Sequence, residues 1–294
     1  MLSPPPNRPA APVRQGVAEL TLALRGGRTR LARSSTRPPL QVQGALHPER
    51  TLPAMALVLL SNPTGGIFQG DDHQISVTAE TGAAAHVSTQ GATRVHAMPL
   101  GQAKQCVSLE VAPGGYLEYL PDPLIPYQDS DFQQRTTIAV KPGGILVSWE
   151  VLTPGRLAMG EAFQYRRLAS HLEVLGEDRV PQYIDSFEII PSRRNPLLEH
   201  VAGPMVPERR AYTLGSMLII AEGRDLRQLQ RELQETTADS NGVPAGVTCL
   251  PGKGALGIRA LGRDCDEVQK ILRRCWAKAR LHLLGVGIPD PRKY

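Results

Sequence analysis

The sequence has few cysteines, no paired cysteine motif and no long apolar run. Its four cysteines form no C-x-x-C pair and no compact zinc-binding pattern, and nothing like a signal peptide precedes them. We therefore expect a reduced, cytoplasmic protein. No segment approaches the roughly 18 apolar residues that a membrane-spanning helix needs, so we expect no membrane span.

Aromatic residues are also scarce, at 4% of the chain, and none lies among the arginines of the first 50 residues. That segment holds eight arginines against two glutamates, within a chain of net charge +5. A surface for single-stranded nucleic acid needs aromatic side chains beside its basic groups. The composition therefore favours a solvated basic arm and edge strand. Nucleic-acid binding is an alternative, and it predicts binding that weakens steeply with salt.

A functional phosphate-binding loop is also missing. The stretch SNPTGGIFQGDDH follows the apolar run AMALVLL, and Gly65 and Gly70 have the glycine spacing of a P-loop. Asp71 and Asp72 stand where such a loop needs Lys and Ser or Thr, and two carboxylates there would repel a polyphosphate. The next segment, QISVT, alternates like a strand. We interpret the stretch as a glycine-rich turn between two strands that ends in an acidic pair beside His73.

Glycine and proline, in contrast, are abundant and punctuate short alternating segments that predict a mainly β fold. A strand, glycine turn, strand unit recurs: Pro113-Gly114-Gly115 maps onto Pro142-Gly143-Gly144 at a spacing of 29 residues, and Gly82 precedes Gly114 by 32. Repeats of this length predict stacked β-layers, arranged like a β-helix, in which each unit buries its face against the next. Ordinary hairpins in a sandwich are the alternative.

Two helices are expected in the C-terminal third. Residues 224–235 place leucines at helical spacing, and residues 264–284 carry one apolar stripe with an acidic start and basic later turns. A strand at LGIRALG should separate them. The Pro-rich residues 1–16 predict a disordered tail, followed by a single domain over residues 17–294.

The candidate chemistry lies in carboxylates, because Glu118, Glu150 and Glu161 sit in apolar, glycine-flanked segments. Buried carboxylates are costly unless they are paired, hydrogen-bonded or metal-bound. Three interpretations stay open: a glycosidase-like acid/base pair, an oxygen-rich path for a divalent cation, or structural ion pairs with arginines. The arginines considered for such pairs are Arg94, Arg156 and Arg166.

Several ordered motifs carry a family resemblance. The segments GRTRLARSSTRPPLQVQ, NPTGGIFQGDDHQISVTAETGAAAHVSTQGATRVH, LEYLPDPLIPYQDSDFQQRTTIAV and WEVLTPGRLAMGEAF, with the long helix ending in PDPRKY, resemble the urease accessory protein UreD (UreH) family in order. The resemblance covers most of the chain from about Gly27 onward.

The resemblance implies a non-enzymatic scaffold, largely β with two helices. It would bind the urease apoprotein and, through UreF, the GTPase UreG, and would help nickel reach the urease active site through an internal tunnel. The resemblance implies transient Ni²⁺ but no tightly bound cofactor, and it implies a dimer of the accessory complex. The residues carried over by motif as the nickel path or tunnel lining are Asp71, Asp72, Thr93, Arg94 and Glu150. Glu161 and Asp185 are added from position alone, whereas Arg156 and Gly160 are interpreted as structural.

The alternative function is a β-helix carbohydrate-active enzyme that uses paired carboxylates. An enzyme should turn over a sugar by itself, whereas a maturation factor should co-purify with its partners.

Overall fold

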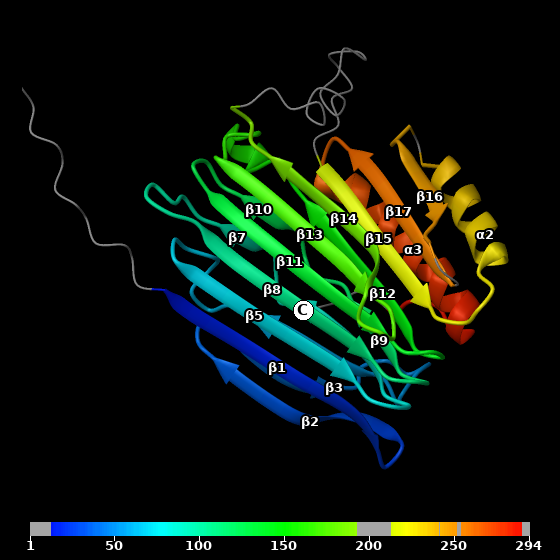
Figure 1. Cartoon of the computed structure of the whole chain (residues 1–294). Coiled ribbons are helices and arrows are strands. Elements are labelled where there is room, and N and C mark those ends of the chain that lie inside the picture. Colours follow the sequence, from blue (N-terminus) through cyan, green and yellow to red (C-terminus); the bar gives the residue numbers. More distant parts are fainter. Residues whose placement is uncertain (1–12, 193–212, 241, 252–253, 290–294) are drawn as a thin grey trace, which may run out of the picture.

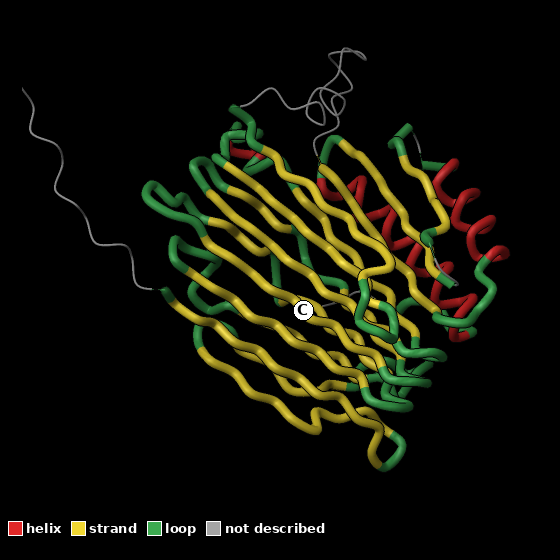
Figure 2. The backbone as a smooth tube through the Cα atoms, in the orientation of Figure 1, coloured by secondary structure: helices red, strands yellow, loops and turns green. Residues whose placement is uncertain are grey.

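The computed structural model describes residues 13–192, 213–240, 242–251 and 254–289, and two facing β-sheets dominate it (Figures 1 and 2). Sheet A has the order β14-β13-β11-β8-β5-β1-β2, and sheet B has the main path β16-β17-β15-β12-β9-β6-β4-β3. The strands of sheet A are β1 (Arg14–Arg25), β2 (Arg28–Arg37), β5 (Asp71–Ala79), β8 (Ala103–Val111), β11 (Asp131–Val140), β13 (Arg167–Leu175) and β14 (Pro181–Ile189).

The strands of sheet B are β3 (Gln41–Leu46), β4 (Ala56–Ser61), β6 (Ala84–Thr89), β9 (Tyr116–Tyr119), β12 (Ile145–Leu152), β15 (Thr213–Ala221), β16 (Ala245–Cys249) and β17 (Ala255–Gly262), with the short β7 (Thr93–Val95) and β10 (Leu124–Pro126) beside them. A 3₁₀ turn, η1 (Leu157–Met159), precedes β13, and the helices are α2 (Arg227–Ala238) and α3 (Cys265–Leu284). Neither helix of the described chain combines the length and apolar composition that crossing a membrane would take.

The predicted stacked repeat is confirmed. Each unit runs along a strand of sheet A, turns at a glycine and returns along a strand of sheet B, as in β5–β6, β8–β9 and β11–β12, and corresponding strands pair in parallel. Gly82, Gly114 and Gly143 occupy the same place in successive turns at φ between +71° and +80°, a conformation that glycine adopts without a steric cost. The turns stack, because the Gly114 N–H donates to the Gly143 carbonyl at 3.1 Å.

Sheet B has apolar residues on both faces and therefore separates two cores. Residues such as Leu117 and Leu146 face sheet A, whereas Val147 and Ile219 face α2 and α3. Alternation along each strand produces this division. No helix of the described chain covers the outer face of sheet A (Figure 1).

Both predicted helices are confirmed, although α2 begins and ends three residues later than the predicted range 224–235. Local signals explain the ends of α3. The Asp264 side chain accepts a hydrogen bond from the Glu267 N–H at 2.9 Å at the N-terminus. Gly285 ends the helix in the left-handed conformation. The predicted strand between the helices is β17. The predicted tail over residues 1–16 falls mostly outside the described residues, and residues 14–16 form the start of β1.

The stretch SNPTGGIFQGDDH is a turn between β4 and β5, as predicted. Asn62 organises it: its Nδ2 donates to the Gly66 carbonyl at 2.7 Å, and its Oδ1 accepts from the Thr64 N–H at 3.1 Å. Ile67 then makes an isolated parallel bridge to Val95.

Gly66→Ala is expected to destabilise the protein by about 2 kcal/mol more than Gly65→Ala. Both glycines have positive φ, but a Cβ on Gly66 would lie 2.4 Å from the Arg94 carbonyl oxygen, whereas a Cβ on Gly65 meets nothing within 4 Å. Urea unfolding of the two variants measures the difference. Equal losses would show that the close approach at Gly66 is not a constraint.

Candidate functional site: a polar seam between the sheets

A row of polar side chains crosses the inner face of sheet A. Adjacent strands bring together His73, Gln105, Gln134 and Ser170 in one cross-strand register. These residues alternate with outward-facing neighbours, so their side chains point toward sheet B. Buried polar groups cost free energy unless they are hydrogen-bonded, so such a row is unusual between two apolar sheet faces.

Sheet B carries polar residues opposite this row. Glu150 of β12 pairs in register with Ser216 of β15, which pairs with Arg259 of β17. We call the two facing rows the polar seam, whose members are His73, Gln105, Gln134, Ser170, Glu150, Ser216 and Arg259.

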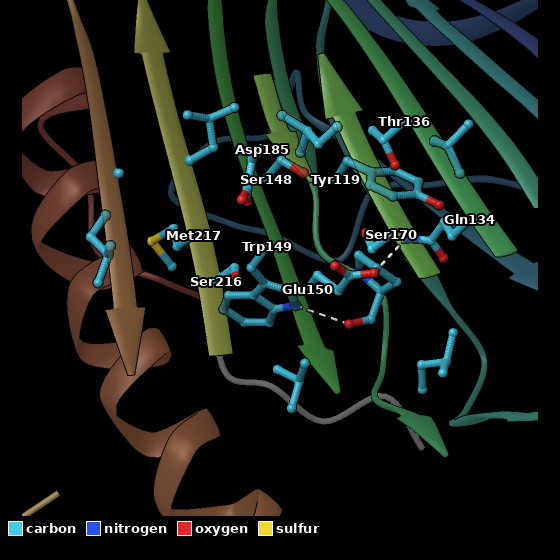
Figure 3. Close-up of a pocket in the computed structure, with 18 of the residues that line it drawn as sticks. Tyr119, Gln134, Thr136, Ser148, Trp149, Glu150, Ser170, Asp185, Ser216 and Met217 are labelled. Atoms are coloured by element: carbon cyan, nitrogen blue, oxygen red, sulfur yellow. Dashed lines mark hydrogen bonds between the residues drawn. The ribbon is translucent and has the colours of Figure 1, made fainter. Parts of the chain in front are cut away.

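Glu150 lies at the centre of the seam, in a cavity of about 130 Å³ that we call cavity 1 (Figure 3). Gln134 Nε2 donates to Glu150 Oε1, and Gln105 Nε2 donates to Gln134 Oε1 at 3.2 Å. A chain of hydrogen bonds therefore links β8 and β11 of sheet A to this carboxylate of β12. Trp149, the residue before Glu150, points to the other side of sheet B, and its indole N–H donates to the Pro121 carbonyl at 2.9 Å.

Burial raises the pKa of Glu150 to about 7, because the charged carboxylate loses hydration there. The hydrogen bond from Gln134 and the positive charge of Arg259 act in the opposite direction, and Asp185 adds to the increase. At neutral pH the carboxyl is thus divided between its protonated and charged forms, and an arriving cation would favour the charged form.

A second hollow, cavity 2 with about 360 Å³, adjoins the first. Both cavities are lined by Ile75, Thr89, Thr93 and Gln105, so they meet along the seam. Cavity 2 also reaches the glycine turn of residues 61–67 and Arg94. Of the residues predicted from sequence, Thr93 lines both cavities, Arg94 lines cavity 2 and Glu150 lines cavity 1.

The adjacent aspartates lie on opposite faces of sheet A. Asp71 and His73 alternate inward and are almost completely buried, whereas Asp72 between them is half-buried and faces outward. Asp71 Oδ2 accepts from the Phe68 N–H at 2.8 Å and lies 3.7 Å from His73 Nε2. Asp71 Oδ1 and His73 Nε2 are buried without a hydrogen-bond partner among the described residues. Burial lowers the pKa of His73 despite the two aspartates, so a neutral imidazole with an available lone pair is favoured.

His73 is accommodated by a glycine across the strand pair. A Cβ on Gly16 of β1 would lie 2.9 Å from His73 Cδ2. In the described chain neither aspartate is among the residues that line cavities 1 and 2, but His73 lines cavity 2. The acidic pair predicted from sequence is therefore divided into one buried Asp–His pair near the seam and one outward carboxylate.

Glu118 takes part in a different cluster, between sheet B and α3. Its Oε1 accepts from the Tyr116 hydroxyl at 2.6 Å and from the Trp276 indole N–H at 2.8 Å, and its Oε2 lies 2.8 Å from His86 Nδ1. The Arg280 guanidinium forms an ion pair with the same carboxylate at 3.2 Å. Arg280 and Glu118 are completely buried. A second carboxylate, Glu49 in the segment between β3 and β4, accepts from Arg280 Nη2 at 2.7 Å.

Glu161 lies in a third place, the loop between β12 and β13. It pairs with Arg156, whose guanidinium lies over the Tyr127 ring at 4.1 Å. The interpretation of Arg156 as a structural residue stays a prediction. Because Glu118 and Glu150 face opposite sides of sheet B and Glu161 lies in a loop, these three carboxylates form no acid/base pair around a common cleft.

Within the described ranges, no group of three or more His, Cys, Asp or Glu side chains is arranged to hold a metal ion. The oxygen and nitrogen atoms along the seam instead come singly or in pairs. Gln105, Gln134 and Ser170 were not predicted. A signal for two of them exists, since the spacings of 32 and 29 residues that relate the glycine turns also relate His73, Gln105 and Gln134.

Comparison with known proteins places the chain in a family. The family model described as UreD urease accessory protein matches residues 14–294. A urease accessory protein UreD from Haloarcula marismortui is 34% identical over 284 residues, covering 97% of this chain and 92% of the relative. One from Cenarchaeum symbiosum is 32% identical, with 94% and 95% covered. A urease accessory protein UreD 2 from Streptomyces griseus is 34% identical, with 97% and 96% covered.

Proposed function

Because this chain belongs to the UreD family of urease accessory proteins, we propose that it is a non-catalytic maturation factor that conducts nickel to the urease active site along the polar seam. It would bind the urease apoprotein and UreF, and UreG through UreF, with the accessory complex forming a dimer. The cytoplasm is the expected location, since all four cysteines are free thiols.

The observation that carries this proposal is the continuity of cavities 1 and 2 through a core that is otherwise apolar. A buried polar lining has no folding advantage over a hydrocarbon one, because each polar group must be paired to avoid a desolvation cost. The lining presents carboxylate, amide and hydroxyl oxygens together with an imidazole, the kinds of ligand that a divalent cation uses. Such a lining is suited to the passage of an ion.

The sparse donors suit transfer better than storage. A site with three or four strong ligands would retain nickel, whereas one or two donors at a time allow release to the next position. Asp71 with His73 would provide one such binding position, and Glu150 would provide the next. Thr93 and Arg94 line the cavities between these two positions. Nickel is the cargo in this scheme, and no resident cofactor is required.

Asp71→Asn is expected to reduce nickel loading of urease by about tenfold, whereas Asp72→Asn should leave it near the wild-type level. The reason is that Asp71 is buried beside His73, and Asp72 faces the opposite side of the sheet. The measurement is nickel per urease active site and urease activity after co-expression with all accessory proteins. Equal effects of the two variants would contradict the assignment of Asp71 to the path.

Partner binding is tested by purification of the tagged full chain from cells that express urease and the accessory proteins. We expect urease and UreF to co-purify and nickel to reach urease. Recovery of neither UreF nor urease would overturn the proposal, and turnover of a carbohydrate by the isolated chain would favour the enzyme alternative.

A further inference from the structure

A third hollow, cavity 3, lies beyond cavity 1 and has a volume of about 320 Å³. Its lining is mainly apolar and includes Phe163, Leu168 and Ile189. Among the residues that the structure describes, Asp185 and Arg259 alone line both cavity 1 and cavity 3. These two residues are bonded to each other, so a single ion pair occupies the junction between the cavities.

The pair connects the two sheets. Asp185 comes from β14 of sheet A, and Arg259 comes from β17 of sheet B, which lies on the other side of the cavity. Arg259 Nη2 donates to Asp185 Oδ2, and its Nη1 donates to the Ser216 hydroxyl. Ser216 is the register partner of Glu150. The junction is therefore continuous with the centre of the seam.

The charges at this junction bear directly on a passing cation. A guanidinium in the path repels a divalent cation, and the carboxylate beside it attracts one. Glu150 is the register partner of Ser216, which accepts from Arg259, and all three residues line cavity 1 with Asp185. A cation at Glu150 is thus within electrostatic reach of both partners of the pair.

The Arg259 side chain has room to move, because 42% of its surface is exposed, against 27% for Asp185. An arginine at this exposure can exchange a carboxylate for water at small cost, since ion pairs near the surface contribute little. The two carboxylate oxygens of Asp185 would then be available to the cation.

We propose that the Asp185–Arg259 ion pair is an exchange gate, in which the passing divalent cation displaces Arg259 from Asp185 and Arg259 later displaces the cation into cavity 3. This inference rests on the proposed nickel path. The arginine serves two purposes: it closes the junction when no cation is present, and it competes for the carboxylate so that the cation does not remain there. The apolar lining of cavity 3 offers few ligands that would hold the ion after release.

The test is a double-variant cycle in the full chain, co-expressed with urease and the other accessory proteins. Asp185→Asn leaves the Arg259 charge uncompensated at the junction, and we expect about tenfold less nickel per urease active site. Adding Arg259→Gln removes the repulsive charge, and the double variant should recover to within about threefold of wild type. A pair that only holds the sheets together predicts the reverse, with the double variant at least as impaired as Asp185→Asn, and that result would overturn the gate.

A second measurement does not depend on urease or on the folding of the aspartate variant. Purified chain loaded with Ni²⁺ is mixed with a chelator, and Ni²⁺ should leave Arg259→Gln several-fold more slowly than wild type, because the competing guanidinium is gone. Arg227→Gln is the matched control, since Arg227 pairs with Asp225 at the exposed start of α2. Equal release rates from wild type and Arg259→Gln would reject the gate.

The gate and the path fail in different ways. If Glu150→Gln and Asp71→Asn both leave nickel loading unchanged, the path itself is wrong. If those two variants reduce loading but Arg259→Gln neither rescues Asp185→Asn nor slows release, the path stands and the gate is wrong. The thermal midpoint and co-purification of each variant with UreF monitor folding throughout.

Discussion

Glu118→Gln is expected to lower the free energy of unfolding by about 3 kcal/mol at pH 7. Glu118 is the only carboxylate that contacts His86, Tyr116 and Trp276 among the described residues, and Arg280 approaches it at 3.2 Å. The amide would keep an acceptor for the indole, but it would leave the completely buried Arg280 with Glu49 alone as its counter-charge. Removing one member of a buried ion pair leaves an uncompensated buried charge. This costs far more stability than replacing both members with apolar residues would.

The pH dependence of this effect has a definite sign. Burial alone would raise the pKa of Glu118, but the hydrogen bond and charge of His86, the charge of Arg280 and the Tyr116 hydroxyl together lower it below its ordinary value. The charged carboxylate therefore contributes stability above its unfolded-state pKa, and this contribution is lost as the pH falls through the lower folded-state pKa. The difference between wild type and Glu118→Gln should be largest near neutral pH and shrink in acid.

Urea unfolding from pH 3 to pH 8 measures both statements, because the loss in acid begins only below the ordinary pKa of 4.5. Glu110→Gln is the control, because Glu110 is an exposed carboxylate of β8 whose partner Arg179 is also exposed, and we expect a change within about 0.5 kcal/mol. A Glu118→Gln protein as stable as the control variant would show that the cluster between sheet B and α3 does not hold the helix in place.

Glu150→Gln is expected to have the opposite effect on stability and to impair function. Burial raises the pKa of Glu150 to about 7, from an ordinary value of 4.5. The folded state therefore binds more protons than the unfolded state between these values, and stability falls as the pH rises through that window. The full cost is present above pH 7 and amounts to between about 3 and 4 kcal/mol at most, from about 1.4 kcal/mol per pKa unit.

The glutamine variant removes this cost while it keeps the side-chain volume and an acceptor for Gln134. We expect a gain in stability at pH 8 that disappears near pH 4.5, together with about tenfold lower nickel loading of urease. Glu173→Gln is the control, since it removes a carboxylate from the outer face of β13, where Thr137 donates to it at 3.0 Å. Greater stability with normal nickel loading would mean that Glu150 is buried without a role in the path.

The two carboxylates show how far the repeat could be followed from sequence. The 29-residue spacing aligns Glu118 with Val147, and the structure has that register. Glu150 lies three residues beyond Val147, an odd offset, and odd offsets along a strand reverse the face. The same reasoning separates Asp71 from Asp72 and aligns Gln105 with Gln134. These placements could be predicted from the sequence, because strand alternation and glycine turns are local properties.

The amino-acid sequence alone was sufficient for the mainly β stacked repeat, the presence of both helices, the ends of α3 and the glycine turn before β5, because each depends on neighbours in the chain. The contacts that define the sites depend on the path of the chain through space. Trp276 meets Glu118 across 158 residues, and Arg259 meets Asp185 across 74 residues. No periodicity connects such pairs, since they come from different layers, and only the packing of sheet A, sheet B and α3 brings their charges together.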